Sequence, residues 1–191
     1  TWLCFFMIIE QIGERELAIS HIIRSIYMVL MIPLFGFSTA TSTLVSNIIG
    51  QGRINEVILL VKRVALLCLV CTAILMPLNI LFPEEIISIY SNDMTLVKDA
   101  IPVLYVITGA MLLFSIAFIS FAAVTGTGKT LITLAIEITA ICIYLSGAYF
   151  LGVHFELPLY LVWCSEFIYF GIMGSLSILY LKYGNWKTSS I

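Results

Sequence analysis

The chain has 191 residues, of which 61% are hydrophobic and 10% are charged, and its formal net charge is −2. Soluble domains are about 45–50% apolar and about 25% charged, so this composition, with a mean hydropathy of +1.12, excludes a water-soluble monomer. We therefore expect this chain to lie in a lipid bilayer. We expect no nucleic acid among its partners.

The apolar segments are long and predict helices that cross a membrane. A hydrocarbon core of about 30 Å requires about 20 helical residues, and the segments lack the two-residue alternation of membrane β-barrels. We predict an all-α, polytopic membrane helix bundle, with residues 1–191 forming a single membrane domain. Its spans are the partial tail of an earlier helix at 1–12, a longer helical stretch at 17–50 that is broken near Pro33 and Gly36, and full spans at 64–82, 100–124, 131–153 and 157–181.

The chain begins at Thr1 inside an apolar run, TWLCFFMII. No basic segment precedes this run, and no small-residue cleavage site follows before the charged residues ERE. We interpret this end as a cut edge and not as a signal peptide, which predicts that the chain is a piece of a longer protein.

The charges between the spans predict an orientation. Loop 51–63 carries three basic residues and the C-terminal tail carries Lys182 and Lys187, whereas loop 83–99 carries four acids and one base. Short basic loops stay on the cytoplasmic side of a membrane. We expect a multi-pass protein of the inner (plasma) membrane, with loops 51–63 and 125–130 and the C-terminus in the cytoplasm and loops 10–16, 83–99 and 152–157 outside.

The stretch AVTGTGKTLITL, residues 123–134, has the appearance of a phosphate-binding loop. A nucleotide P-loop needs a glycine where this chain has Ala123, and it follows a short buried strand. Here both flanking segments are membrane-length helices. We therefore predict a tight turn, with Lys129 at the lipid headgroups, and no nucleotide site.

Two acids lie in the middle of predicted spans, where a charged group usually faces a cavity or a partner. Glu137 shares a helix face with Tyr144, and Glu166 shares one with Tyr169. One interpretation is a protonatable cavity in which each carboxyl binds a proton or a small cation while the tyrosines contact a substrate. The other is that each Glu is a hydrogen-bonded partner between helices.

The end of the 17–50 segment has a broad face of small and polar residues, in two rows with a spacing of four. These rows are Ser38, Ser42, Ser46 and Gly50, and Thr39, Thr43, Asn47 and Gln51. For the serine row we favour close helix packing over a cavity or gate lining. Asn47 and Gln51 are larger, and we predict that they contact water or another helix end and belong to a substrate or cation site.

Three motifs between residues 38 and 130 resemble those of the multidrug and toxic compound extrusion (MATE) family. STATSTLVSNIIGQG followed by RINEV is similar to the glycine-rich end of the second helix of one half of such a protein. LFPEEIISIYSNDMTLVKDA is similar to an outer loop of the family, and AAVTGTGKT is similar to the turn between its tenth and eleventh helices.

This resemblance implies the C-terminal half, one six-helix bundle with a truncated first helix, of a twelve-helix transporter. It implies an antiporter that exports drugs or other amphipathic or cationic compounds in exchange for protons or sodium, with the N-terminal half as its partner. The family often has an acidic cation site in its seventh and tenth helices. Segment 100–124 contains no acid, so Glu137 and Glu166 are not carried over from the resemblance.

Two alternatives are less well supported by the residues. A lipid-linked oligosaccharide flippase of the same superfamily is expected to line its cavity with several Arg or Lys residues, and only Arg24 lies within a span. A membrane-embedded enzyme needs clustered His and acidic residues, and the two histidines are far apart. We interpret Cys68 and Cys71 as thiols that pack in a membrane helix and do not bind metal. Together with the separated histidines, this interpretation predicts that the chain is not an enzyme and needs no metal or cofactor beyond the coupling ion.

Overall fold

The computed structural model describes residues 2–186, so Lys187 of the predicted basic tail lies outside the described residues. Over that range the chain forms helices joined by short turns, without a strand, which confirms the predicted all-α class. The elements are α1 (Trp2–Ile12), α2 (Glu14–Gly50), a 3₁₀ turn (Ile54–Glu56), α3 (Val57–Leu81), α4 (Pro83–Ser88), α5 (Met94–Gly126), α6 (Thr130–Tyr149), a π-helical turn (Phe150–His154), α7 (Leu159–Trp163) and α8 (Ser165–Tyr183).

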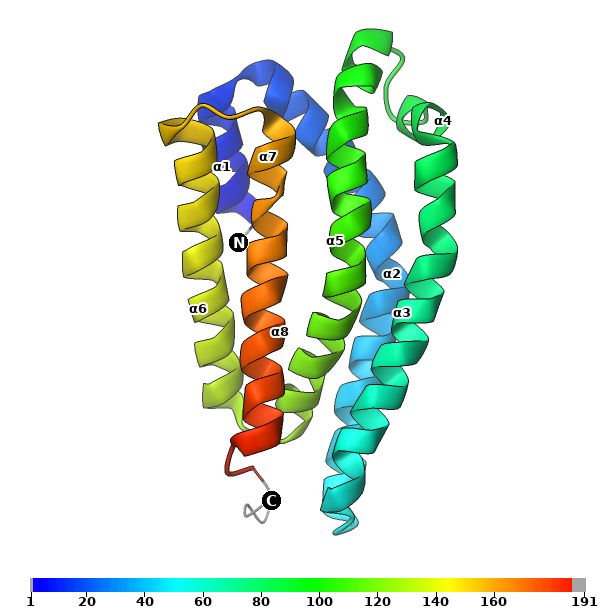
Figure 1. The fold of residues 1–191 in the computed structure, drawn as a ribbon, viewed down its shortest axis with the longest axis vertical. Helices are drawn as coiled ribbons and strands as arrows, with labels where there is room; N and C mark the ends of the chain where they lie inside the picture. Colours follow the sequence, from blue (N-terminus) through cyan, green and yellow to red (C-terminus); the bar gives the residue numbers. More distant parts are fainter. Residues whose placement is uncertain (1, 187–191) are drawn as a thin grey trace.

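Five helical segments of the described range are long and apolar enough to cross a membrane, and α1 is a shorter apolar helix. The five are Glu14–Gly50, Ile54–Leu81, Met94–Gly126, Thr130–His154 and Leu159–Tyr183. They stand side by side as one helix bundle (Figure 1), as expected for a helical membrane domain.

Helix α5 lies at the centre of the bundle, between α6 and α8 on one side and α2 and α3 on the other (Figure 1). The most apolar stretch of α5 is 61% buried, whereas that of α3 is 17% buried and that of the α6 segment is 22% buried. Exposed leucines and isoleucines therefore cover the outer surfaces of α3 and α6, as lipid-facing helices require. The loops predicted to share a side of the membrane also lie at the same end of the bundle (Figure 1).

Helix α2 runs without interruption from Glu14 to Gly50, so the predicted break near Pro33 and Gly36 is wrong. Proline removes one helical hydrogen bond, but its fixed φ is compatible with a helix. A full break inside lipid would leave further backbone groups without partners, which is more costly than the single lost bond. Packing of α2 along α5 and α3 also holds the helix in place.

Glycine allows α5 to approach two neighbouring helices closely. A Cβ on Gly126 would lie 2.6 Å from the carbonyl oxygen of Ser42, and one on Gly174 would lie 2.8 Å from the Cβ of Ala117. The Ser46 hydroxyl donates a 2.8 Å hydrogen bond to the carbonyl of Gly126. These contacts support the packing interpretation of the serine row on α2.

The stretch that resembles a P-loop is a tight turn between α5 and α6. Helix α5 ends at Gly126 and α6 begins at Thr130. Gly128 has a φ of +75°, a left-handed conformation that glycine adopts without strain. The short reversal places α6 antiparallel to α5, as the sequence predicts.

Candidate functional site

Four of the residues predicted to form a site meet between α6 and α8. The Tyr169 hydroxyl of α8 donates a 2.8 Å hydrogen bond to Oε1 of Glu137 on α6. The Tyr144 hydroxyl of α6 donates a 3.0 Å hydrogen bond to Oε1 of Glu166 on α8. The rings of Tyr144 and Tyr169 are 5.5 Å apart between centroids, so the two pairs adjoin.

The two carboxyls come from opposite ends of the bundle. Glu137 is seven residues into the Thr130–His154 segment and Glu166 is seven residues into the antiparallel Leu159–Tyr183 segment. At about 1.5 Å per residue, each lies about 10 Å inside its own end. The two tyrosines lie between these depths, so the polar groups form a row along the bundle rather than a single cluster.

Glu166 is the most enclosed member of this row. Its side chain is 5% exposed, and Tyr144 and Tyr27, which both lie beside its carboxyl, are each 2% exposed. Burial of a carboxylate is unfavourable unless hydrogen bonds replace its water. The Tyr144 hydroxyl donates one such bond to the Glu166 carboxyl. Glu137 is half-buried and more open than Glu166.

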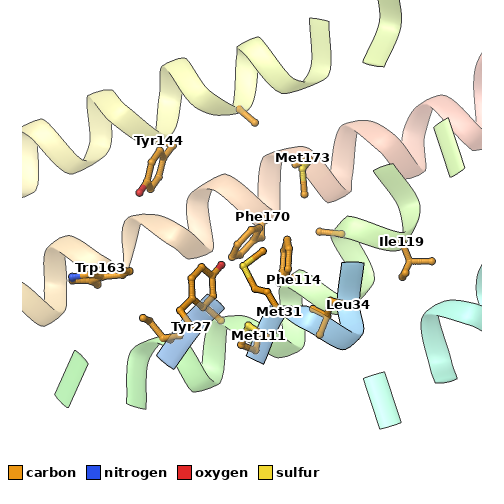
Figure 2. Packing of buried hydrophobic residues seen from close by; sticks show 14 of the residues in the cluster. Tyr27, Met31, Leu34, Met111, Phe114, Ile119, Tyr144, Trp163, Phe170 and Met173 are labelled. Atoms are coloured by element: carbon orange, nitrogen blue, oxygen red, sulfur yellow. The ribbon is translucent and has the colours of Figure 1, made fainter. Parts of the chain in front are cut away.

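The two carboxyls and both tyrosines line one cavity of about 240 Å³. Its remaining lining is almost wholly apolar and comes from α1, α2, α5 and α8: Trp2, Tyr27, Met31, Phe35, Phe114, Phe118 and Phe170. Phe114 and Phe170 approach each other across α5 and α8, with ring centroids 4.3 Å apart (Figure 2). Carboxylates beside aromatic ring faces favour a cation over an anion.

Each Glu thus has features of both interpretations given above. Each is hydrogen bonded between α6 and α8, as a packing role requires, and each also lines a cavity, as binding requires. Arg24 does not neutralise either of them by an ion pair within residues 2–186. Its guanidinium instead lies over the rings of Trp2 and Phe6, 5.8 Å and 5.4 Å from their centroids.

Asn47 and Gln51 do not join this row. Both are exposed at the end of α2 that lies beside the α5–α6 turn. The Gln51 side chain accepts a 3.2 Å hydrogen bond from Arg53, which also pairs with Glu56. Asn47 and Gln51 therefore lie on the bundle surface, outside the cavity. That they belong to a substrate or cation site stays a prediction.

Sequence reasoning missed the apolar half of the cavity, above all Trp2, Tyr27 and Phe114. A signal for Tyr27 exists, because Ser20, Tyr27, Met31 and Leu34 recur at helical spacing and are all buried. Such a stripe is typical of any packed helix, so it does not distinguish a cavity wall from a core. Phe114 carries no signal of its own within an apolar span.

The sequence profile of the MatE family matches residues 2–150, which include α1 to α6. A curated relative, the probable multidrug resistance protein NorM of Thermotoga maritima, is 25% identical over 160 residues. The match covers 83% of this chain and 34% of the relative, so the chain spans about a third of that relative's length. With the family profile covering most of the helical bundle described above, the chain belongs to the MatE family.

Proposed function

We propose that this chain is the C-terminal bundle of a cation-coupled antiporter that exports drugs or other amphipathic or cationic organic compounds. Its MatE membership and its similarity to a probable multidrug resistance protein support this function. In this proposal Glu137 and Glu166 bind the coupling ion, a proton or sodium. The N-terminal half of the same transporter completes the substrate path, and the bundle alone is inactive.

The observation that carries this proposal is the row of two carboxyls joined by two tyrosines along an aromatic-walled cavity. A transporter must couple two ligands through one element that responds to both. A coupling ion bound at Glu137 would compete with the Tyr169 hydrogen bond, and one bound at Glu166 would compete with Tyr144. Binding would therefore change the contact between α6 and α8.

The test is transport by the full-length protein in vesicles, with proton and sodium gradients imposed separately. We expect Glu137→Gln and Glu166→Gln each to reduce gradient-driven drug export by about 5- to 150-fold, the range typical of coupling between two sites. Glu85→Gln, which removes an exposed carboxyl of α4, is the matched control and should leave transport unchanged. Undiminished export with both acids replaced would remove them from the mechanism.

We also propose that the α5–α6 turn and the C-terminus face the cytoplasm of the inner (plasma) membrane. The basic residues of loop 51–63 and Lys182 support this orientation. A reporter that is active only in the cytoplasm, fused after Trp186, should be active. An active periplasmic reporter at the same position would reverse the orientation.

A further inference from the structure

A second large hollow lies on the surface of the bundle and shares no lining residue with the cavity of the carboxyl row. It is a groove of about 510 Å³ between α3 and α8, with α5 as its floor. Its lining is almost entirely aliphatic: Ile58, Val61, Ala65, Ile116, Ile178 and Leu181. None of these residues lines the cavity that contains Glu137 and Glu166, so the groove is a separate feature.

Two lysines and Ser120 of α5 complete the lining of this groove, and the Ser120 hydroxyl donates its hydrogen bond to the carbonyl of Ile116. Lys62 lies in the second turn of α3, and Lys182 lies in the last turn of α8. Each of the two helices that form the sides of the groove therefore contributes one lysine. Both are exposed, and neither forms an ion pair with a carboxylate of residues 2–186. The Lys182 ammonium lies 4.9 Å from the ring centroid of Tyr183, a contact that leaves it at the surface.

The chemistry of the groove selects its occupant. The most apolar stretch of α3 is only 17% buried, so this side of the groove is open to the surroundings of the bundle. An aliphatic wall in that position favours contact with a hydrocarbon chain. Both ammonium groups lie where the groove meets the helix ends, and neither has a carboxylate partner within residues 2–186. They favour a negative group at the depth of the headgroups. The same charges disfavour the cationic compounds proposed as substrates. An inorganic phosphate would satisfy the lysines but would leave the aliphatic lining unused.

We propose that this groove binds an anionic phospholipid, with an acyl chain along α5 and the headgroup phosphate between Lys62 and Lys182. The proposal does not depend on the transport function or on the roles of Glu137 and Glu166. The bound lipid links the ends of α3 and α8, which do not pack extensively on each other in the described bundle. Anionic lipid therefore stabilises this arrangement of the two helices.

The proposal is tested on the purified full-length protein in detergent by native mass spectrometry, titrated with dioleoyl phosphatidylglycerol or dioleoyl phosphatidylcholine. We expect phosphatidylglycerol to bind more tightly than phosphatidylcholine and to raise Tm. Lys62→Gln and Lys182→Gln should each weaken phosphatidylglycerol binding by about fivefold, and the double variant by about 25-fold. Lys98→Gln, in the first turns of α5 at the opposite end of the bundle, is the matched control and should bind as the unchanged protein does.

A second variant, Ala65→Phe, fills the groove and leaves both lysines in place. It should weaken phosphatidylglycerol binding while monodispersity and helix content stay unchanged. Equal binding of the two lipids by the unchanged protein, or unaltered binding by the double lysine variant, would overturn the proposal. So would an equal loss in Lys98→Gln, or binding of inorganic phosphate as tight as that of the lipid.

Discussion

The Tyr169 hydroxyl and Oε1 of Glu137 are 2.8 Å apart and join α8 to α6 inside a membrane bundle. The contact is the more open of the two Tyr–Glu pairs, because Glu137 is half-buried while Glu166 is 5% exposed. A hydrogen bond to a charged group contributes about 1.5–3 kcal/mol to the stability of a protein. Removal of one partner leaves the other unsatisfied and destabilises the fold. The pair therefore provides a measurable link between these helices.

We predict that Tyr169→Phe and Glu137→Gln have non-additive effects on the free energy of unfolding. Each change removes or weakens the same hydrogen bond, so the double variant should lose about 1–2 kcal/mol less than the sum of the single variants. Unfolding in mixed micelles measures this coupling energy. Tyr169→Phe combined with Glu85→Gln, which lies on α4, should be additive, and additivity for the Tyr169–Glu137 pair would contradict the contact.

A second prediction concerns Gly126, where a Cβ would lie 2.6 Å from the Ser42 carbonyl oxygen and 2.9 Å from the Cβ of Val45. Gly126→Ala forces the two helices apart and should destabilise the protein by about 1–3 kcal/mol. Gly36→Ala is the control, since a Cβ there would have no atom within 4 Å. Its effect should be neutral or stabilising by up to about 1 kcal/mol, because alanine favours a helix. A drop in Tm with Gly36→Ala as large as with Gly126→Ala would argue against the close approach.

A third prediction concerns the buried indole of Trp163, which is 0% exposed and donates a 3.2 Å hydrogen bond to the Ser20 hydroxyl. Ser20→Ala leaves the indole N–H without an acceptor in the core and should cost about 1–3 kcal/mol. Ser25→Ala is the matched control on the same helix, because the Ser25 hydroxyl bonds only the carbonyl of His21 one turn earlier. Equal thermal stability of the two variants would show that the indole finds another acceptor.

The fourth prediction concerns pH. Oδ1 of Asp93, which caps α5, accepts hydrogen bonds from the Thr95 hydroxyl at 2.7 Å and the Thr95 backbone N–H at 2.8 Å. These bonds lower the pKa of Asp93. Since the pKa is lower in the folded state, the stabilisation is present above the unfolded pKa of about 3.9 and is lost as pH falls through the folded pKa.

Asp93→Ala should therefore reduce Tm near neutral pH, and the difference from the unchanged protein should shrink as the pH falls below about 3.9. Asp93→Asn retains an acceptor for the cap without the titration, so its Tm difference should depend less on pH. Melting curves over a pH series in detergent measure both effects. A Tm difference for Asp93→Ala that is constant with pH would show that the capping carboxylate does not contribute.

The fold was predictable from the sequence because lipid imposes one strong constraint. Backbone N–H and C=O groups in a bilayer must be hydrogen bonded within the chain, so a long apolar run without two-residue alternation, such as the one that forms α5, is expected to be a helix. The same constraint explains the error at Pro33, where soluble-protein rules predict a break and lipid favours a continuous α2.

The candidate site was predictable only in part. The cost of a charge in lipid singles out Glu137 and Glu166, and helical spacing places Tyr144 and Tyr169 on the same faces. The crossed pairing, in which each tyrosine bonds the Glu of the other helix, depends on how α6 and α8 face each other. That orientation is set by how the side chains of α6 and α8 pack in three dimensions, and the spacing of residues along either helix does not reveal it.

The contact at Gly126 also restricts how the bundle can rearrange. The backbone of α5 at Gly126 closely approaches the Ser42 carbonyl of α2, and the Ser46 hydroxyl donates a hydrogen bond to the Gly126 carbonyl. Helix α2 also packs along α5 beyond this point, so the two helices share a continuous interface that is fixed at its Gly126 end. A rearrangement of this bundle that preserves the contact must therefore move α2 and α5 as one unit, whereas α6 packs mainly on α8 and touches that unit only slightly.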